Sequence, residues 1–311
     1  GKFEMQQFPS PSSGLRYKVL SLPPNFPLDA EGLDAEGLDE DLDEGQEHAV
    51  CTMSYAIRST FRDRNRALSL GLLPLKDANA PRTANLITRP DHYLWQLNTP
   101  ETVLDFLKQS FPQLPLQHIL SSTELDRFTH SNGGAFPIPQ FCSGLYSLLS
   151  SSSNSESSEI AVPGILLLGD AVHCFPPDIG QGVNSALEDV VVLHQVLAEN
   201  EDDLARSLPQ YEKVRSPDVR AVVRLAQFAA PWQYNQDRLR GRLWMLAFVV
   251  RLGLSKLLPL IHPPAFALIQ NHDLSYQEIW QRNRHTTQRL IAMTGILIAG
   301  LMGLVALLLK P

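Results

Sequence analysis

The hydrophobic positions between residues 164 and 197 change from an unbroken run to a helical spacing. Ile165 to Leu168 are consecutive apolar residues between turn formers, which predicts a short strand buried on both faces. A loop rich in proline and glycine follows. Apolar residues then return at the spacing of a helix, at Val183, Ala186, Leu187, Val190, Val191 and Leu197. The stretch therefore predicts a strand, a loop and a helix in succession.

Alternating apolar positions near the beginning of the chain predict an antiparallel sheet. The predicted strands span residues 14–22, 49–57, 66–73 and 84–88, the last followed by an extended segment over 93–97. Thr99 and Pro100 form a typical helix start, with a capping hydroxyl before a proline, and this helix ends before Pro112. A weaker pattern predicts a second helix over 116–126.

Two long apolar stretches lie near the C-terminus. Residues 243–260 are interrupted by Arg251 and Lys256, which predicts an amphipathic helix folded on the protein or lying on a membrane surface. Residues 290–309 contain no charge, and a helix of this length crosses a hydrocarbon core of about 30 Å. Basic residues gather on its N-terminal side. We therefore expect a single-pass C-terminal membrane anchor with the folded part in the cytosol.

The net charge of −7 comes from one segment. Residues 29–47 hold ten acids, and the remaining chain holds 26 basic and 23 acidic residues. Within 28–48 few large apolar groups are present, so we expect a solvated, disordered insertion. The serine run at 150–158 predicts a surface loop. No basic patch with interleaved aromatic residues occurs, so a nucleic-acid partner is not indicated.

The cysteines and histidines form no ligand or disulfide pattern. Cys51, Cys142 and Cys174 lack even, regular spacing, which favours a reducing compartment over a secreted one. The nine histidines show no metal-ligand spacing, so we predict no metal site. His173 is expected to hydrogen-bond the backbone and hold the loop in which it lies, rather than to act in acid–base catalysis.

Candidate chemistry gathers where the predicted strand, loop and helix meet. Asp170, at the carboxyl end of a strand, is suited to accept hydrogen bonds from ribityl or ribose hydroxyls. Gly180 and Gly182 leave room for the backbone to approach a ligand closely. The helix that follows adds unpaired N–H donors and a positive dipole end. This combination suits a flat, phosphate-bearing cofactor whose reduced ring carries negative charge.

The run GDAVHCFPPDIGQGVNSALED resembles the FAD signature of the FAD-dependent aromatic hydroxylases, a flavoprotein monooxygenase family, and most closely that of the kynurenine 3-monooxygenases. The resemblance implies that Asp170 binds the ribityl chain and that the segment from Pro177 to Asn184 lies along the flavin. Pro177 would lie near the reactive edge of the ring, which makes it the catalytic candidate. The implied cofactor-binding residues are Gly169, Asp170, Pro177, Gly180, Gln181, Gly182, Val183 and Asn184.

The resemblance also implies the architecture, an α/β (overall α+β) fold like that of p-hydroxybenzoate hydroxylase. We expect a substrate domain with an antiparallel sheet (1–145), a serine-rich loop (146–160), the C-terminal part of an FAD-binding domain (161–235), a helical region (236–285) and the membrane anchor (290–309). No GxGxxG turn for the FAD pyrophosphate occurs in the 311 residues. The chain thus matches the C-terminal two thirds of such an enzyme, and we expect it to retain FAD weakly or not at all by itself.

The implied reaction is NAD(P)H-dependent hydroxylation of an aromatic or related apolar substrate through a flavin C4a-hydroperoxide, with FAD and NADPH as cofactors. Ala229 and Phe266 stand near the places of an Asn and a Tyr that hold the substrate carboxylate in kynurenine enzymes, and neither repeats that contact. The anchor implies a membrane location, and the resemblance implies that this membrane is the mitochondrial outer membrane. Two alternatives remain: a noncatalytic, tail-anchored interaction protein, and a flavin oxidoreductase that does not use oxygen.

Overall fold

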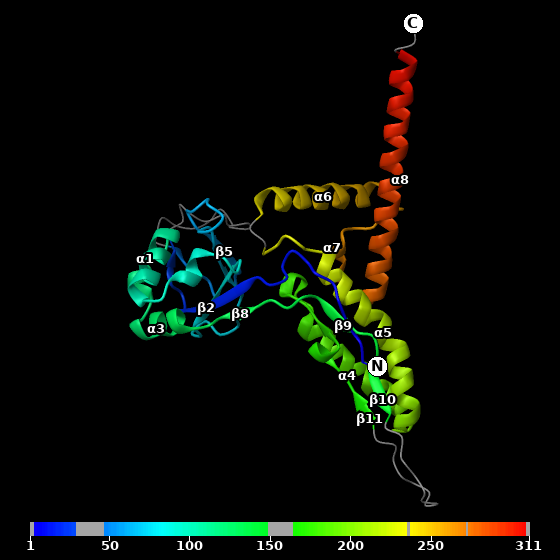
Figure 1. Ribbon diagram of the computed structural model, residues 1–311, viewed down its shortest axis with the longest axis horizontal. Helices are drawn as coiled ribbons and strands as arrows, with labels where there is room; N and C mark the ends of the chain where they lie inside the picture. The colour runs from blue at the N-terminus through cyan, green and yellow to red at the C-terminus, as the bar shows by residue number, and fades with distance from the viewer. Residues whose placement is uncertain (1–2, 29–46, 149–163, 235–236, 272, 309–311) are drawn as a thin grey trace, which may run out of the picture. The chain divides into compact units, whose positions relative to one another are not determined.

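The computed structural model describes residues 3–28, 47–148, 164–234, 237–271 and 273–308 (Figure 1). The chain divides into two compact units. Residues 1–13, 137–233 and 238–311 form unit 1, and residues 14–136 and 234–237 form unit 2. The predicted acidic insertion and serine-rich loop lie almost entirely outside the described residues.

Unit 2 is built around an antiparallel five-stranded sheet with the strand order β5-β6-β7-β2-β8. Its strands are β2 (Arg16–Leu22), β3 (Pro27–Leu28), β4 (Glu47–His48), β5 (Tyr55–Arg58), β6 (Ser69–Leu72), β7 (Arg82–Thr88) and β8 (Gly134–Ala135). Its helices are η2 (Tyr93–Gln96), α1 (Pro100–Ser110), α2 (Leu116–Ile119) and α3 (Ser122–His130). The antiparallel sheet predicted for this part of the chain is confirmed.

One face of this sheet and the helices share a hydrophobic core. In β2 the side chains of Lys18, Leu20 and Leu22 are buried, while those of the alternate residues are half-buried. Leu20 and Leu22 join Phe106 of α1 and Phe128 of α3 in the core. The alternation of side chains along a strand thus places one row of β2 toward the helices.

Two sequence predictions in unit 2 are wrong in detail. Residues 93–96 form the 3-10 helix η2 instead of an extended segment, because the His92 ring accepts a hydrogen bond from the Leu94 N–H at 3.1 Å. The helix predicted over 116–126 is two helices. The second begins after Ser121, whose hydroxyl accepts a hydrogen bond from the Glu124 N–H at 3.1 Å. By contrast, α1 begins after its Thr99 cap as predicted.

Arg82 holds the loops at one end of this sheet. Its side chain is fully buried and donates hydrogen bonds to the carbonyl oxygens of Val50, Met53 and Leu73 at 2.9, 3.0 and 3.1 Å. Hydrogen bonds to a charged donor are stronger than those between neutral groups. One buried guanidinium therefore joins three backbone carbonyl groups from two separate loops.

Unit 1 combines two small antiparallel sheets with long helices. The sheets have the orders β1-β9-β12 and β10-β11. The strands are β1 (Met5–Gln7), β9 (Gln140–Cys142), β10 (Tyr146–Leu148), β11 (Gly164–Leu166) and β12 (His173–Cys174). The helices are η3 (Gly169–Ala171), η4 (Pro177–Ile179), α4 (Gly182–Glu199), α5 (Leu204–Phe228), α6 (Arg238–Leu257), α7 (Ala265–Leu268) and α8 (Tyr276–Leu308).

The strand predicted from Ile165 to Leu168 differs from the structure. The observed strand β11 ends at Leu166, and Ile165 is 47% exposed, so the prediction of burial on both faces is wrong. Among the described residues β11 pairs only with β10, and this sheet of two strands leaves much of β11 uncovered. The helix predicted after the loop is confirmed as α4, although Val183, Leu187, Val190 and Val191 on it are exposed.

The core of unit 1 forms where α5 packs against α4 and α8 (Figure 1). Val222, Leu225 and Ala226 of α5 are fully buried, and α5 continues through two internal prolines. The amphipathic stretch predicted near residue 250 is the helix α6, in which no residue is fully buried.

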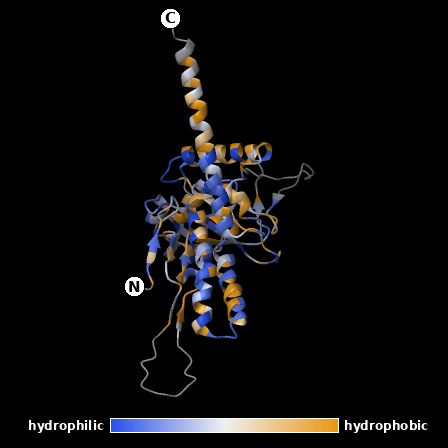
Figure 2. Cartoon of the chain, turned by 90° about the vertical axis from the view of Figure 1, so that its right-hand side faces the viewer, coloured by the Kyte–Doolittle hydropathy of each residue, from blue (hydrophilic) through white to orange (hydrophobic). Residues whose placement is uncertain are grey.

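The apolar C-terminal stretch belongs to α8. The first part of this helix, from Tyr276, is rich in polar residues, and its second part is hydrophobic (Figure 2). Within the described part of the chain, no helix has the length and apolar character needed to cross a membrane. This finding contradicts the anchor predicted for residues 290–309, the last of which lies outside the described residues. The predicted membrane location is therefore wrong as well.

Replacing Arg82 by Met tests its role in unit 2. Because three hydrogen bonds from a buried guanidinium are lost, we expect the free energy of unfolding to fall by about 3 kcal/mol in urea denaturation. Arg64→Met, at an exposed position in a turn, is the matched control and is expected to change it by less than about 0.5 kcal/mol. Equal effects of the two substitutions would refute the role given to Arg82.

Candidate functional site

The Gly-Asp pair of the signature lies in a tight turn after β11. Gly169 has a φ of +56°, a left-handed conformation that side chains with a Cβ rarely adopt. A Cβ at this position would also lie 3.4 Å from the Cβ of Ala186 on α4. The next residue, Asp170, is exposed in the 3-10 turn η3. The turn thus presents a carboxylate to the surface while its glycine packs on α4.

The proline- and glycine-rich loop leads into the N-terminus of α4. Gly180 has a φ of +62°, and a Cβ added at Gly180 or Gly182 would meet nothing within 4 Å. Gln181 is the N-cap of α4, and its side chain makes no capping hydrogen bond. The first-turn N–H groups of α4 are therefore open to an external acceptor, and the helix dipole favours a negative one.

Asp178 connects this loop to the N-terminal segment. Its buried carboxylate accepts a hydrogen bond from the Ser12 hydroxyl at 2.6 Å, and the other oxygen, Oδ2, has no partner among the described residues. Burial raises the pKa of Asp178 to about 6, and the hydrogen bond from Ser12 offsets part of that rise.

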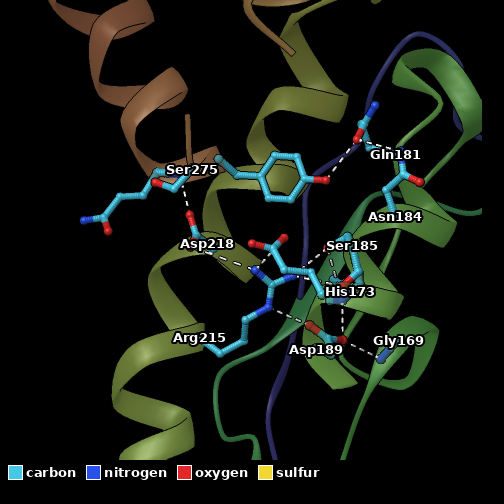
Figure 3. A network of polar contacts seen from close by, with 12 residues as sticks. Gly169, His173, Gln181, Asn184, Ser185, Asp189, Arg215, Asp218 and Ser275 are labelled. Atoms are coloured by element: carbon cyan, nitrogen blue, oxygen red, sulfur yellow. Dashed lines mark hydrogen bonds and ion pairs between the residues drawn. The ribbon is translucent and has the colours of Figure 1, made fainter. Parts of the chain in front are cut away.

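A buried polar network lies beneath the Gly-Asp turn (Figure 3). Asp189 of α4 uses Oδ2 to accept a hydrogen bond from the Gly169 N–H at 2.8 Å, and the His173 Nε2 lies 2.8 Å from the same oxygen. Its Oδ1 accepts a hydrogen bond from the Arg215 Nε at 2.7 Å. One carboxylate thus joins the turn, the strand β12 and the helix α5.

Arg215 extends this network along α4. It donates to the carbonyl oxygen and hydroxyl of Ser185 at 2.9 and 3.0 Å, and pairs with Glu188 at 3.0 Å. Burial alone would raise the pKa of Asp189, but the bonds and charges of His173 and Arg215 and the Gly169 N–H hold it below its usual range. Asp189 is therefore a buried carboxylate stabilised in its charged form.

His173 holds the loop through a partner different from the one expected. Its side chain is completely buried and bonds to Asp189 instead of to the backbone. Ser185, His173 and Asp189 are the residue types of a hydrolase triad, but the same ring nitrogen, Nε2, faces both the carboxylate and, at 3.5 Å, the hydroxyl. A triad needs the two ring nitrogens to face different partners, so this group has a structural role.

The structure brings the predicted residues Gly169, Asp170 and the segment from Pro177 to Asn184 into unit 1, at the two ends of one loop. Sequence reasoning missed Asp189 and Arg215, which support that loop from below. The available signal was a carboxylate at Asp189, four residues after Ser185 and so on the same face of the predicted helix. Within the residues that the structure describes, no cluster of three or more His, Cys, Asp or Glu side chains is arranged to hold a metal ion.

The raised pKa of Asp178 predicts a pH dependence of stability. The folded-state value of about 6 lies above that of an unfolded chain, about 3.9, so the folded state holds its proton more tightly. We expect the contribution of this group to be lost as the pH rises from about 4 to 6, by about 3 kcal/mol in total. Urea denaturation of the wild type and of Asp178→Asn, which cannot titrate, should therefore diverge over this range. Parallel curves would contradict the assignment.

Removal of Arg215 tests the buried network. Arg215→Met leaves the Asp189 carboxylate buried without its cation, which is expected to lower the free energy of unfolding by about 3 to 5 kcal/mol. Arg206→Met is the control on the same helix, since Arg206 is 77% exposed and pairs with Asp203 at the surface. That change is expected to cost less than about 1 kcal/mol. A similar loss in both variants would show that the network contributes little.

Comparison with known proteins agrees with this geometry. The family model described as "FAD binding domain" matches residues 158–226, which hold the turn, the loop, α4 and most of α5. Kynurenine 3-monooxygenase of Sus scrofa is 24% identical over 235 residues, covering 73% of this chain and 45% of that protein. The enzyme of the same name from Anopheles gambiae is 32% identical over 106 residues, or 34% of this chain and 21% of that protein.

Among solved structures, Klebsiella pneumoniae HpxO complexed with FAD and uric acid is 18% identical, with a TM-score of 0.39 over 78% of this chain and 50% of that one. The tetrameric form of 2-methyl-3-hydroxypyridine-5-carboxylic acid oxygenase is 14% identical, with a TM-score of 0.43 over 76% of this chain and 51% of that one. The chain spans less than half the length of the Sus scrofa relative. On the family-model match and the sequence relatives, this chain is a relative of the FAD-dependent aromatic hydroxylases.

Proposed function

We propose that the protein is an FAD-dependent monooxygenase that hydroxylates an aromatic or related apolar substrate with electrons from NADPH. The observation that carries this proposal is the exposed Asp170 carboxylate in a glycine turn, inside the segment matched by the FAD-binding model. The relatives that match most of the chain are named as monooxygenases.

The residues of unit 1 fit the flavin end of FAD. Gly180 and Gly182 have open space where a side chain would stand, so the backbone there is accessible to a ring edge. The N-terminus of α4 offers N–H donors and a positive dipole end to the pyrimidine rim. Asp170 would accept hydrogen bonds from ribityl hydroxyls. When bound, FAD supplies the activation of oxygen for transfer to the substrate.

The chain's own residues would bind the flavin, orient it and exclude water from it. Pro177 would pack near the reactive edge of the ring, where its missing backbone N–H leaves the loop without a hydrogen-bond donor at that position. The polar groups beneath the turn are buried and paired with one another, so they do not compete for the cofactor. Gln181, Val183 and Asn184 complete the proposed contacts with the flavin.

The proposed substrate is aromatic and largely apolar. Ala229 is nearly buried, at 7% exposure, and Phe266 lies in α7, and neither side chain offers a hydrogen bond to a carboxylate. We therefore propose that the protein accepts substrates less polar than kynurenine. Comparison of substrate-stimulated NADPH oxidation with kynurenine and with an apolar aromatic compound tests this choice. Stronger stimulation by kynurenine would overturn it.

Replacing Asp170 by Asn tests the proposed FAD site. Because charge-assisted hydrogen bonds contribute about 1.5 to 3 kcal/mol each, we expect the Kd for FAD to rise by about 10-fold or more. The measurement is flavin fluorescence titration of the full-length protein. Asp105→Asn, an exposed carboxylate on α1, is the matched control and should leave the Kd unchanged. Unaltered FAD affinity in the Asp170 variant would refute the site.

Oxygen consumption separates the proposed reaction from its alternatives. With FAD bound, we expect NADPH oxidation and oxygen uptake to rise together on addition of substrate. Product formation without oxygen uptake would point to a non-oxygenase flavin enzyme instead. A preparation that binds no flavin would favour a noncatalytic protein.

A further inference from the structure

The start of α8 is held firmly beside α4 and α5. The Ser275 hydroxyl accepts a hydrogen bond from the Glu278 N–H at 3.2 Å, and the Glu278 carboxylate accepts one from the Ser275 N–H at 3.0 Å. This reciprocal pair is a capping box. In addition, Asp218 of α5 accepts a hydrogen bond from the Gln277 N–H at 2.7 Å. The first turn of α8 is thus fixed from two sides.

Tyr276 reaches from this fixed turn to the loop that precedes α4. Its hydroxyl donates to the Gln181 Oε1 at 2.9 Å (Figure 3), and its side chain is 8% exposed. The Asn184 side-chain amide donates to the same oxygen at 3.3 Å. Burial, with the charge of Glu188 adding to it, raises the pKa of Tyr276 to about 12, so the hydroxyl keeps its proton as a donor.

The loop has few other restraints at this point. A cavity of about 290 Å³ lies between α4 and the start of α8. It is lined by Gln181, Asn184, Glu188, Ile269, Asn271, Leu274, Tyr276 and Ile279. The preceding Gly180 has no atom within 4 Å of its Cβ position, and Gln181 makes no capping bond of its own. Without the bond from Tyr276, Gln181 would keep the 3.3 Å bond from Asn184, with open space on one side and a glycine on the other.

We propose that Tyr276 is a positioning residue for the cofactor loop: by fixing the side chain of Gln181 it sets where the N-terminus of α4 meets the flavin. This inference rests on the proposed FAD site. It makes α8, far along the chain from the signature, part of the support for the cofactor.

The same contacts connect α8 to the other end of the loop. Asp218, which holds the Gln277 N–H, lies 3.9 Å from the Arg215 guanidinium, and Arg215 bonds to the Asp189 carboxylate that holds Gly169. The two ends of the segment from Gly169 to Gly182 are therefore supported by one continuous set of polar contacts. Tyr276 is the member of that set that reaches the flavin-ring end.

A matched pair of tyrosine variants of the full-length protein tests the proposal. Tyr276→Phe removes only the hydroxyl that bonds to Gln181, and we expect the Kd for FAD to rise by about 3- to 10-fold. The visible absorption band and fluorescence of the bound flavin should shift as well, because its polar rim meets a displaced loop. Tyr211→Phe is the control, since the Tyr211 hydroxyl is buried and has no partner among the described residues. It should change neither the Kd nor the flavin spectrum.

The acceptor side of the bond provides a second test. Gln181→Glu keeps an oxygen acceptor and Gln181→Met removes it, so Tyr276→Phe should weaken FAD binding further in the Glu variant and have no added effect in the Met variant. This coupling separates positioning from a general loss of stability, which would be additive.

The outcomes also separate this inference from the proposed function. If the full-length wild-type protein binds no FAD, the proposed function fails, and the inference fails with it. If the wild type binds FAD and Tyr276→Phe matches Tyr211→Phe in Kd and flavin spectrum, the FAD site stands and the positioning role is overturned.

Discussion

The structure of unit 1 depends on one buried carboxylate, that of Asp189. It accepts hydrogen bonds from a backbone N–H in the Gly-Asp turn and from the Arg215 guanidinium, and it pairs with the ring of His173. A buried charge is tolerated only when it is fully paired. Asp189 therefore holds four elements together: the Gly-Asp turn, β12, α4 and α5. These contacts fix the turn and so also fix the position of the exposed Asp170 within it.

The residues that support the loop are different from those proposed to bind the cofactor. The residues that hold the loop are buried and satisfy one another, whereas Asp170 and the glycines of the loop face open space. Networks of this kind fix geometry because each member loses its partner if another moves. A cofactor site assembled on such a base can keep its backbone donors in place without lining the pocket with large side chains.

The sequence predicted part of this arrangement and could not predict the rest. The strand-loop-helix order, the start of α4 and the antiparallel sheet follow from local patterns of apolar residues and turn formers. The contacts of Asp189 with Arg215 and of Tyr276 with Gln181 join residues 26 and 95 positions apart, and no local pattern encodes them. The anchor predicted over 290–309 is wrong because, within the described residues, no helix is long and apolar enough to cross a membrane.

The central claim is that the corner between β11 and α4 holds the flavin of FAD. An experimental structure of the full-length protein with FAD bound tests it most directly. The account predicts the Asp170 carboxylate within hydrogen-bond distance of the ribityl hydroxyls and the N-terminus of α4 against the pyrimidine rim. A flavin bound elsewhere, with Asp170 facing solvent and the Gly180–Gly182 backbone out of contact, would contradict it.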